Sequence, residues 1–214
     1  LRATANQHLD NIPGPFAYVS FASPHVVREE HPFTNSSTLS IVPNLHFTIR
    51  SCGDWTNTVS HLSPKDKAFI SGPYGNFAHL RFPEAREFIM VAGGIGITPM
   101  LSMLRFMANV NDKRKITLIW SNRTSKHIVY PDEFSELEER LSGLSIVNVL
   151  TREPEYDGEK GRLDEAKFRR LLAGCSIQST VFTCGPSDMM KDAYRALRRI
   201  GFPCRSIIME RFSL

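Results

Sequence analysis

The fold is decided by the stretch Ala92-Gly93-Gly94-Ile95-Gly96-Ile97-Thr98-Pro99. It joins an apolar run at 88–92, typical of a buried strand, to residues 99–109, whose apolar side chains recur at helical spacing. A glycine-rich turn between a strand and a helix lets the backbone approach an anion closely, and the helix N-terminus offers N–H groups to it. We expect Thr98 to cap this helix and Pro99 to occupy its first position. Such turns also occur for purely structural reasons, and the G-x-x-P ending differs from the common G-x-G-x-x-G pattern.

Strands and helices alternate after this turn. The expected elements are, in chain order, a strand at 116–120, a helix at 132–141, a strand at 145–150, a helix from Asp164 to Gly174, a strand at 180–184, a helix from Ser187 to Gly201 and a strand at 206–209. Alternation of this kind predicts right-handed crossovers and a doubly wound, mostly parallel sheet. Ligands of such sheets bind beyond the carboxyl ends of the strands.

The N-terminal part of the chain has a different pattern. Short β-type runs at 16–21, 46–51 and 67–71 are separated by turn residues at 13–15 and 72–75. No helical periodicity is present over a useful length. We therefore expect a small antiparallel β domain before the α/β domain.

Composition and charge exclude several classes of protein. The hydrophobic fraction of 42% is ordinary for a globular protein, and the net charge of +4 is not gathered into a basic stripe with aromatic residues. We therefore expect no nucleic-acid partner. A small positive excess suits phosphate-bearing cofactors or a position near an anionic membrane surface.

The four cysteines lack C-x-x-C spacing, so we expect no metal site and free thiols in a reducing compartment. The most apolar stretch, 88–104, is broken by glycine and proline, which predicts no membrane span within this sequence.

Further candidate motifs stand at strand ends and turns. Thr183-Cys184-Gly185-Pro186 ends an expected strand, and we expect its thiol to be exposed above a sharp turn; a buried structural cysteine is the alternative. His31-Pro32-Phe33-Thr34, with Ser36 and Ser37 after it, could place an aromatic ring and a hydroxyl against a flat heterocycle, although strand alternation explains it equally well. In Ile49-Arg50-Ser51-Cys52-Gly53-Asp54-Trp55-Thr56, the guanidinium could meet a phosphate, or simply be solvated.

Together these motifs resemble the ferredoxin–NADP reductase superfamily along the whole chain. The likeness is greatest to the dehydrogenase domain of NADPH oxidases and ferric-chelate reductases, which carries H-P-F-T-x-S-S, I-R-x-x-G-D-W-T, G-P-Y-G, A-G-G-x-G-I-T-P and C-G-P in this order. The resemblance implies an N-terminal antiparallel β-barrel that binds FAD, at 1–83, and a doubly wound parallel-sheet domain that binds NAD(P)H, at 84–214. Only twelve residues precede Pro13, where the family has about two barrel strands, so we expect either a sequence truncated at its N-terminus or an incomplete barrel.

The resemblance also implies roles for particular positions. FAD would be held by His31, Pro32, Phe33, Thr34, Ser36, Ser37, Ile49, Arg50, Ser51, Gly53, Asp54, Trp55 and Thr56. The nicotinamide dinucleotide would be held by Gly93, Gly94, Gly96, Thr98, Pro99, Cys184, Gly185 and Pro186, and by Ser121, Arg123 and Thr124. Arg123 would meet the 2′-phosphate of NADPH, which favours NADPH over NADH. Phe212 would cover the flavin, and Thr34, Cys184, Glu210 and Phe212 would stand at the reacting rings.

The function implied by the resemblance is hydride transfer from NADPH to FAD, followed by single-electron transfer to a haem-bearing transmembrane domain of the same chain or complex. The final acceptor would be O₂ or Fe³⁺, and this chain would lie at the cytosolic face of the membrane. One alternative is a soluble NAD(P)H-flavin reductase that serves a ferredoxin-like or oxygenase partner. Another is a catalytically silent, nucleotide-binding regulatory module. An iron–sulfur electron-transfer subunit is disfavoured by the cysteine spacing.

Overall fold

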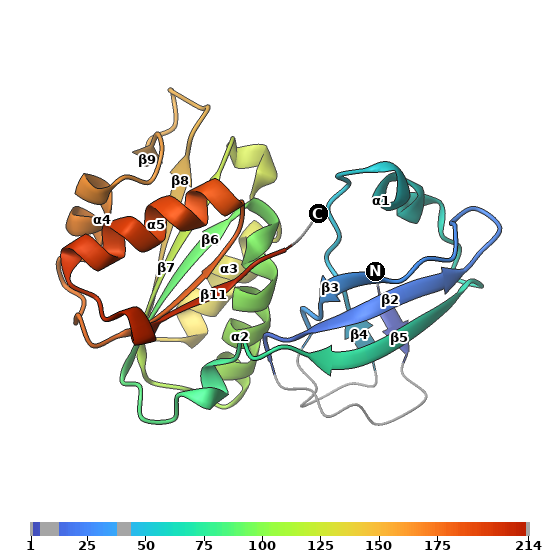
Figure 1. Cartoon of the computed structure of the whole chain (residues 1–214), viewed down its shortest axis with the longest axis horizontal. Helices are drawn as coiled ribbons and strands as arrows, with labels where there is room; N and C mark the ends of the chain where they lie inside the picture. The colour runs from blue at the N-terminus through green and yellow to red at the C-terminus, as the bar shows by residue number, and fades with distance from the viewer. Residues whose placement is uncertain (1, 5–12, 38–43, 213–214) are drawn as a thin grey trace.

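The computed structural model describes residues 2–4, 13–37 and 44–212. Its larger domain is built on a parallel sheet with the strand order β11-β10-β6-β7-β8-β9 (Figure 1). The strands are β6 (Glu87–Gly93), β7 (Lys115–Asn122), β8 (Leu144–Leu150), β9 (Glu159–Lys160), β10 (Thr180–Cys184) and β11 (Ile207–Glu210). Every residue of β6 and β10 is buried, as expected for parallel strands that are covered on both faces.

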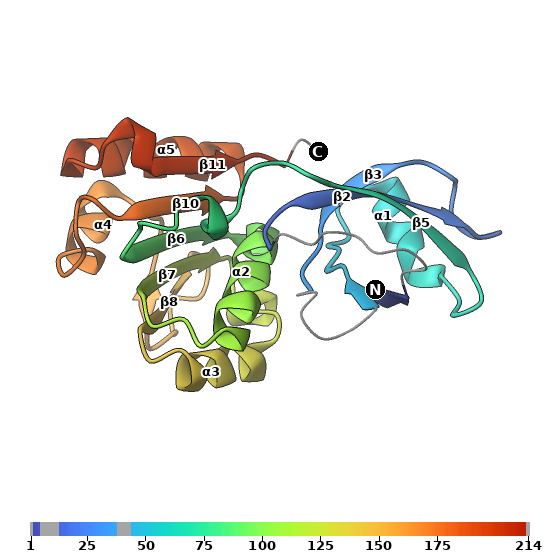
Figure 2. The same cartoon turned by 90° about the horizontal axis from the view of Figure 1, so that it is seen from below.

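Helices cover both faces of this sheet (Figure 2). They are α2 (Ile97–Asn109), α3 (Pro131–Arg140), α4 (Glu165–Leu171) and α5 (Ser187–Ile200), with short 3-10 turns η2 (His79–Arg81), η3 (Gly94–Gly96), η4 (Ser125–His127) and η5 (Cys204–Ser206). Alternate residues of β6 face opposite cores. Phe88 and Met90 pack with α2 and α3, whereas Ile89 and Val91 pack with α4 and α5.

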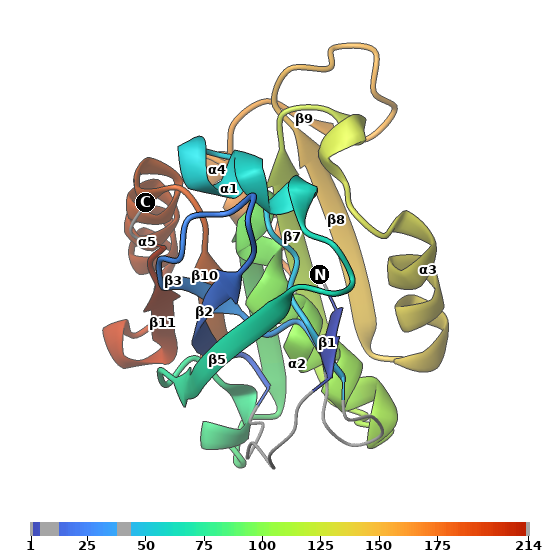
Figure 3. The ribbon, with the colours of Figure 1, turned by 90° about the vertical axis from the view of Figure 1, so that its right-hand side faces the viewer.

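The smaller domain is antiparallel. Its sheet has the order β3-β2-β5, formed by β2 (Phe16–Ala22), β3 (His31–Thr34) and β5 (Lys67–Tyr74). A two-stranded sheet joins β1 (Arg2–Thr4) to β4 (Asn44–His46), and a single bridge links Asn35 to Phe47. The helix α1 (Asp54–Thr58) lies beside these strands (Figure 3), and Trp55 of α1 and Val59 of the turn η1 (Val59–His61) pack against the core of the β domain.

Helix α2 also contacts the β domain. The Ser102 hydroxyl donates to the carbonyl of Ser37 and accepts from the Gly14 N–H, each at 3.3 Å. The Arg105 guanidinium donates to the Ser36 carbonyl and makes two hydrogen bonds, of 2.6 and 2.7 Å, to the Glu133 carboxylate of α3. The helix whose N-terminus follows the glycine-rich turn therefore holds the two domains together.

The expected architecture, an antiparallel β domain followed by a doubly wound α/β domain, is confirmed. The division of the chain at 83/84 stays a prediction. Among the residues that the structure describes, no helix is long and apolar enough to cross a membrane.

Four local expectations were wrong. The strand expected at 46–51 ends at His46, because after the bridge at Phe47 the chain leaves the sheet towards α1. Helix α1 was missed because five residues with none buried carry no periodic pattern. The turn expected at 72–75 belongs to β5 as far as Tyr74. The expected start of α2 was also wrong: the helix already begins at Ile97, so Thr98 is not its N-cap and Pro99 is not its first residue, and the Thr98 hydroxyl donates to the Ile95 carbonyl at 3.1 Å.

Candidate functional site

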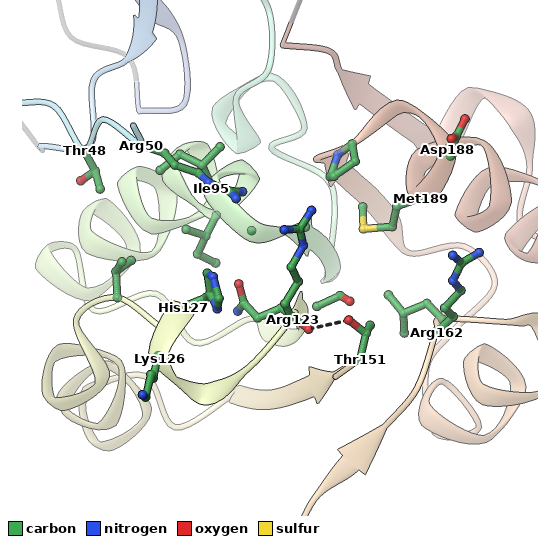
Figure 4. Close-up of a pocket in the computed structure, with 18 of the residues that line it drawn as sticks. Thr48, Arg50, Ile95, Arg123, Lys126, His127, Thr151, Arg162, Asp188 and Met189 are labelled. Carbon is green, nitrogen blue, oxygen red and sulfur yellow. Dashed lines mark hydrogen bonds between the residues drawn. The ribbon is translucent and has the colours of Figure 1, made fainter. Parts of the chain in front are cut away.

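A cavity of about 510 Å³ lies at the carboxyl ends of the parallel strands, where the two domains meet (Figure 4). The β domain contributes Thr48, Ile49 and Arg50 to its wall. The α/β domain contributes the glycine-rich turn, the residues that follow β7 and the start of α5. The position agrees with the expectation that ligands bind beyond the carboxyl ends of the strands.

Two glycine turns form the floor of the site by direct backbone contact. A Cβ atom on Gly96 would lie 2.3 Å from the carbonyl oxygen of Cys184, and one on Gly185, whose φ is +152°, would lie 2.9 Å from the backbone of Gly93. A Cβ on Gly93 would meet Met189 Sδ at 2.6 Å. Glycine at these positions lets the two turns pack this closely, and Gly94, which lines the cavity and whose Cβ would have Arg50 Nη1 as its nearest neighbour at 3.5 Å, leaves the backbone of the turn open to a ligand.

Cationic side chains gather around the cavity. Arg50, Arg123, Lys126 and Arg162 line it, and within the described ranges none of them has an acidic partner. Arg50 lies over the glycine turn, because a Cβ on Gly94 would be 3.5 Å from its Nη1 atom. Asp188 and Asp192 also line the cavity, but each is 3.6 Å from a cation of its own helix, Lys191 and Arg195 respectively. The unpaired guanidinium groups suit phosphates.

The loop that carries Arg123 is held by its own hydrogen bonds. Thr124 Oγ1 and His127 Nδ1 are 2.9 Å apart. The Glu153 carboxylate accepts from the Ser125 N–H at 2.6 Å and from its hydroxyl at 2.9 Å. Arg123 therefore projects from a loop that is fixed before any ligand arrives.

The two motifs of the β domain come together through aromatic rings. The Trp55 ring lies 4.1 Å from His31 and 6.0 Å from Phe33, between ring centres, and its Nε1 donates to the Val27 carbonyl at 2.8 Å. The Thr56 hydroxyl donates to the Gly53 carbonyl at 3.1 Å and accepts from the Cys52 N–H at 2.8 Å. Flat rings beside a turn and the unpaired Arg50 fit a cofactor with a heterocycle and a pyrophosphate, such as FAD.

The hydroxyl groups at the junction of the domains already have partners. Ser36 donates to the His46 carbonyl at 3.0 Å, and the Ser37 hydroxyl donates to Asn35 Oδ1 at 2.6 Å. Thr34 is buried on β3, opposite Phe16. The Ser36 and Ser37 hydroxyls thus bond within the β domain, whereas the carbonyl groups of the same residues accept from Arg105 and Ser102 of α2.

The expectation of an exposed Cys184 thiol was wrong. Cys184 is fully buried, because it is the last residue of a strand covered on both faces. Burial raises the pKa of the Cys184 thiol far above its usual range, and the nearby Glu210 carboxylate raises it further. Cys184 and Glu210 are partners in the β10–β11 register, and burial also raises the pKa of Glu210. Cys184 and Glu210 therefore lie side by side, and Phe212, half-buried, packs against the large core cluster that includes Cys184.

The cavity gathers only part of the predicted site. Of the predicted residues, those in its lining are Ile49, Arg50, Gly93, Gly94, Ser121, Arg123 and Pro186. Those outside the lining are His31, Pro32, Phe33, Thr34, Ser36, Ser37, Ser51, Gly53, Asp54, Trp55, Thr56, Gly96, Thr98, Pro99, Thr124, Cys184, Gly185, Glu210 and Phe212.

Several lining residues were missed from sequence, among them Asn122, Arg162 and Met189. Asn122 could have been found, because a polar residue at the end of an apolar strand signals a ligand edge. Arg162 arrives from a loop after β9 whose path the sequence does not define. Asn122 is buried, and neither atom of its amide has a hydrogen-bond partner within the part of the chain that the structure describes. An open glycine floor, unpaired cations and an unsatisfied amide together fit a nicotinamide dinucleotide.

Comparisons with known proteins agree with this geometry. Residues 90–195 match the family model of the oxidoreductase NAD-binding domain. The chain is 31% identical over 172 residues to NADH-cytochrome b5 reductase 2 of Mycosarcoma maydis, covering 78% of this chain and 48% of that protein. It is 26% identical over 179 residues to the glycine betaine monooxygenase reductase subunit of Chromohalobacter salexigens, covering 79% of this chain and 48% of that protein. The chain thus spans about half the length of these relatives.

A solved structure shows the same fold. The cytochrome b5 reductase domain of Ulva prolifera nitrate reductase superposes with a TM-score of 0.85 at 19% identity, covering 98% of this chain and 90% of that one.

Proposed function

We propose that this chain, which belongs to the ferredoxin–NADP reductase-like superfamily, accepts hydride equivalents from NADPH on FAD and passes single electrons to a haem of a membrane domain. Its cofactors are FAD and NAD(P)H, as for members of this superfamily, and it is an oxidoreductase domain. The choice of NADPH as donor and the haem as acceptor are proposals, as are the NADPH oxidase or ferric reductase type and a place at the cytosolic face of a membrane.

The observation that carries the choice of NADPH is the Arg123 guanidinium. It projects into the cavity from a fixed loop and has no acidic partner within the described residues, so a 2′-phosphate dianion would find a ready cation there. Arg50, which lies over the glycine turn, would meet the pyrophosphate of FAD. The open backbone of the interlocked turns would bring a dinucleotide close to β6 and β10.

The chain's own residues supply binding, orientation and exclusion of water. FAD, when bound, supplies the hydride acceptor and the means to release electrons singly. The domain contacts of Ser102 and Arg105 hold the two binding regions in a fixed relation, which is what transfer between two rings requires. Cys184 is a buried thiol whose raised pKa keeps it protonated, so it does not act as a nucleophile.

The test for the donor is anaerobic reduction of bound flavin by NADPH or NADH, followed by absorbance. We expect half-saturation at a much lower concentration of NADPH than of NADH, and we expect Arg123→Gln to remove about tenfold or more of that preference. Arg152→Gln, a change at an exposed arginine outside the cavity, is the matched control. No bleaching by either nucleotide despite bound FAD would favour the silent regulatory module instead.

The acceptor has two candidates. The membrane-haem reading is supported by the H-P-F-T and I-R-x-x-G-D-W-T motifs at 31–34 and 49–56. A reductase that serves a soluble or oxygenase partner is supported by the likeness to a cytochrome b5 reductase and to the reductase subunit of a monooxygenase. Fractionation of cells that express the tagged native protein, with NADPH added to each fraction, separates them. Reduced haem bands in the membrane fraction support the membrane haem as acceptor. Recovery of the NADPH-oxidising activity in the soluble fraction supports a soluble or oxygenase partner.

A further inference from the structure

Asn122 is an unsatisfied polar residue in the wall of the cavity. It is the last residue of β7 and is only 4% exposed, yet neither Oδ1 nor Nδ2 has a hydrogen-bond partner among the described residues. Its carbonyl accepts from the Thr151 N–H at 2.9 Å and from the Thr151 hydroxyl at 3.2 Å, so the backbone is fixed and the amide alone is left open. Leaving buried polar groups unsatisfied is unfavourable, and native proteins rarely do so without a partner.

The neighbours of Asn122 indicate which part of a dinucleotide it meets. The preceding residue, Ser121, is the register partner of Gly93 at the start of the glycine turn, and the following residue is Arg123. Under the proposed function the turn takes the pyrophosphate and Arg123 takes the 2′-phosphate. In NADPH the adenosine ribose joins these two phosphate-bearing positions, and its 3′-hydroxyl is a free polar group between them.

The chemistry of the side chain agrees with this position. An uncharged amide adds nothing to the cations that already surround the cavity, but it can both donate to and accept from a hydroxyl. Two other hydroxyl groups of the cavity wall are engaged: Thr48 Oγ1 lies 3.2 Å from the Tyr130 hydroxyl and 3.3 Å from Ser36 Oγ, and Thr151 donates to Asn122 itself.

We propose that Asn122 is a nucleotide-contacting residue that recognises the 3′-hydroxyl of the adenosine ribose. The inference rests on the proposed function for the placement of the two phosphates. It assigns recognition of the sugar, which is common to NADPH and NADH, to Asn122, and leaves discrimination between them to Arg123.

The test compares three nucleotides, NADP⁺, NAD⁺ and 3′-deoxy-NAD⁺, by calorimetric titration of the FAD-loaded protein. We expect Asn122→Leu to lower the affinities for NADP⁺ and NAD⁺ by the same factor, roughly tenfold. The wild-type protein should bind 3′-deoxy-NAD⁺ more weakly than NAD⁺ by a similar factor. The Asn122→Leu variant should bind the two ligands almost equally. Without nucleotide, Asn122→Leu should melt no lower than the wild type, because an apolar side chain leaves no amide unsatisfied.

Asn148→Leu is the matched control. Asn148 lies on the adjacent strand β8 opposite Trp120, its Oδ1 also has no partner in the described part of the chain, and it is outside the cavity lining. The Asn148→Leu variant should bind all three nucleotides with wild-type affinity. Wild-type affinity in Asn122→Leu, or an equal loss for NAD⁺ and 3′-deoxy-NAD⁺, would overturn the inference. Tighter binding of NAD⁺ than of NADP⁺ by the wild-type protein would overturn the NADPH proposal and leave the deoxy comparison to decide the role of Asn122.

Discussion

The carbonyl oxygen of Cys184 lies 2.3 Å from the point that a Cβ atom on Gly96 would occupy. The glycine turn before α2 and the turn after β10 are therefore packed backbone to backbone. Any side chain at Gly96 must push apart the two turns on which the nucleotide site is built.

Gly96→Ala should lower the free energy of unfolding by about 1–3 kcal/mol and weaken NADP⁺ binding at least tenfold, because backbone atoms cannot give way as a flexible side chain can. Urea unfolding and calorimetric titration measure the two effects. Gly174→Ala is the control, since a Cβ there meets nothing within 4 Å. A Gly96→Ala protein with wild-type stability and affinity would show that the turns separate without cost.

The thiols should react in an order set by their burial. Cys52 and Cys204 are exposed, Cys175 is half-buried with a pKa raised by burial, and Cys184 is fully buried. With Ellman's reagent we expect fast reaction of Cys52 and Cys204, slow reaction of Cys175 and reaction of Cys184 only after unfolding. Cys184→Ser should leave the count of fast thiols unchanged. A lower count of fast thiols in that variant would place the Cys184 thiol at the surface.

His79 should make stability depend on pH. Burial, and to a smaller extent the nearby Arg114, lower the pKa of its imidazole from an ordinary value of 6.5 to about 4. Between these values the unfolded chain binds a proton that the folded chain does not, so stability falls as the pH falls from about 6.5 to about 4, by roughly 3 kcal/mol in all. His79→Phe should remove most of this slope in urea titrations at stepped pH. His25→Gln, a change at an exposed histidine, should retain it; equal slopes in the wild type and His79→Phe would contradict the assignment.

Periodicity made the α/β domain predictable from sequence. The buried run of β6, the stop of α5 at Gly201 and the cap of α4 by Asp164, whose side chain accepts from the Lys167 N–H, are local signals, and the structure has all three. The β domain was less predictable. Helix α1 and the early end of β4 depend on contacts such as Trp55 with His31, which join residues far apart in the chain.

The site was predictable where a motif carried its own geometry. Gly93, Gly94 and Arg123 line the cavity, and their role in binding a nucleotide stays a prediction. The state of Cys184 was not predictable, because its burial depends on the neighbouring strands and the helices above them. Arg162 was missed for the same reason, because the fold alone brings it to this edge, whereas Asn122 ends an apolar strand and could have been found.

The bridge from Arg105 to Ser36 and Glu133 bears on how such proteins can be recombined. Helix α2 begins at the glycine turn, and its residues Ser102 and Arg105 bond to the β domain. The distance between the two proposed cofactor sites therefore depends on this one helix. The two domains therefore cannot be exchanged independently of each other. A chimera that joins this α/β domain to a foreign flavin domain keeps the spacing only if the foreign domain offers carbonyl groups that accept the hydrogen bonds of Ser102 and Arg105.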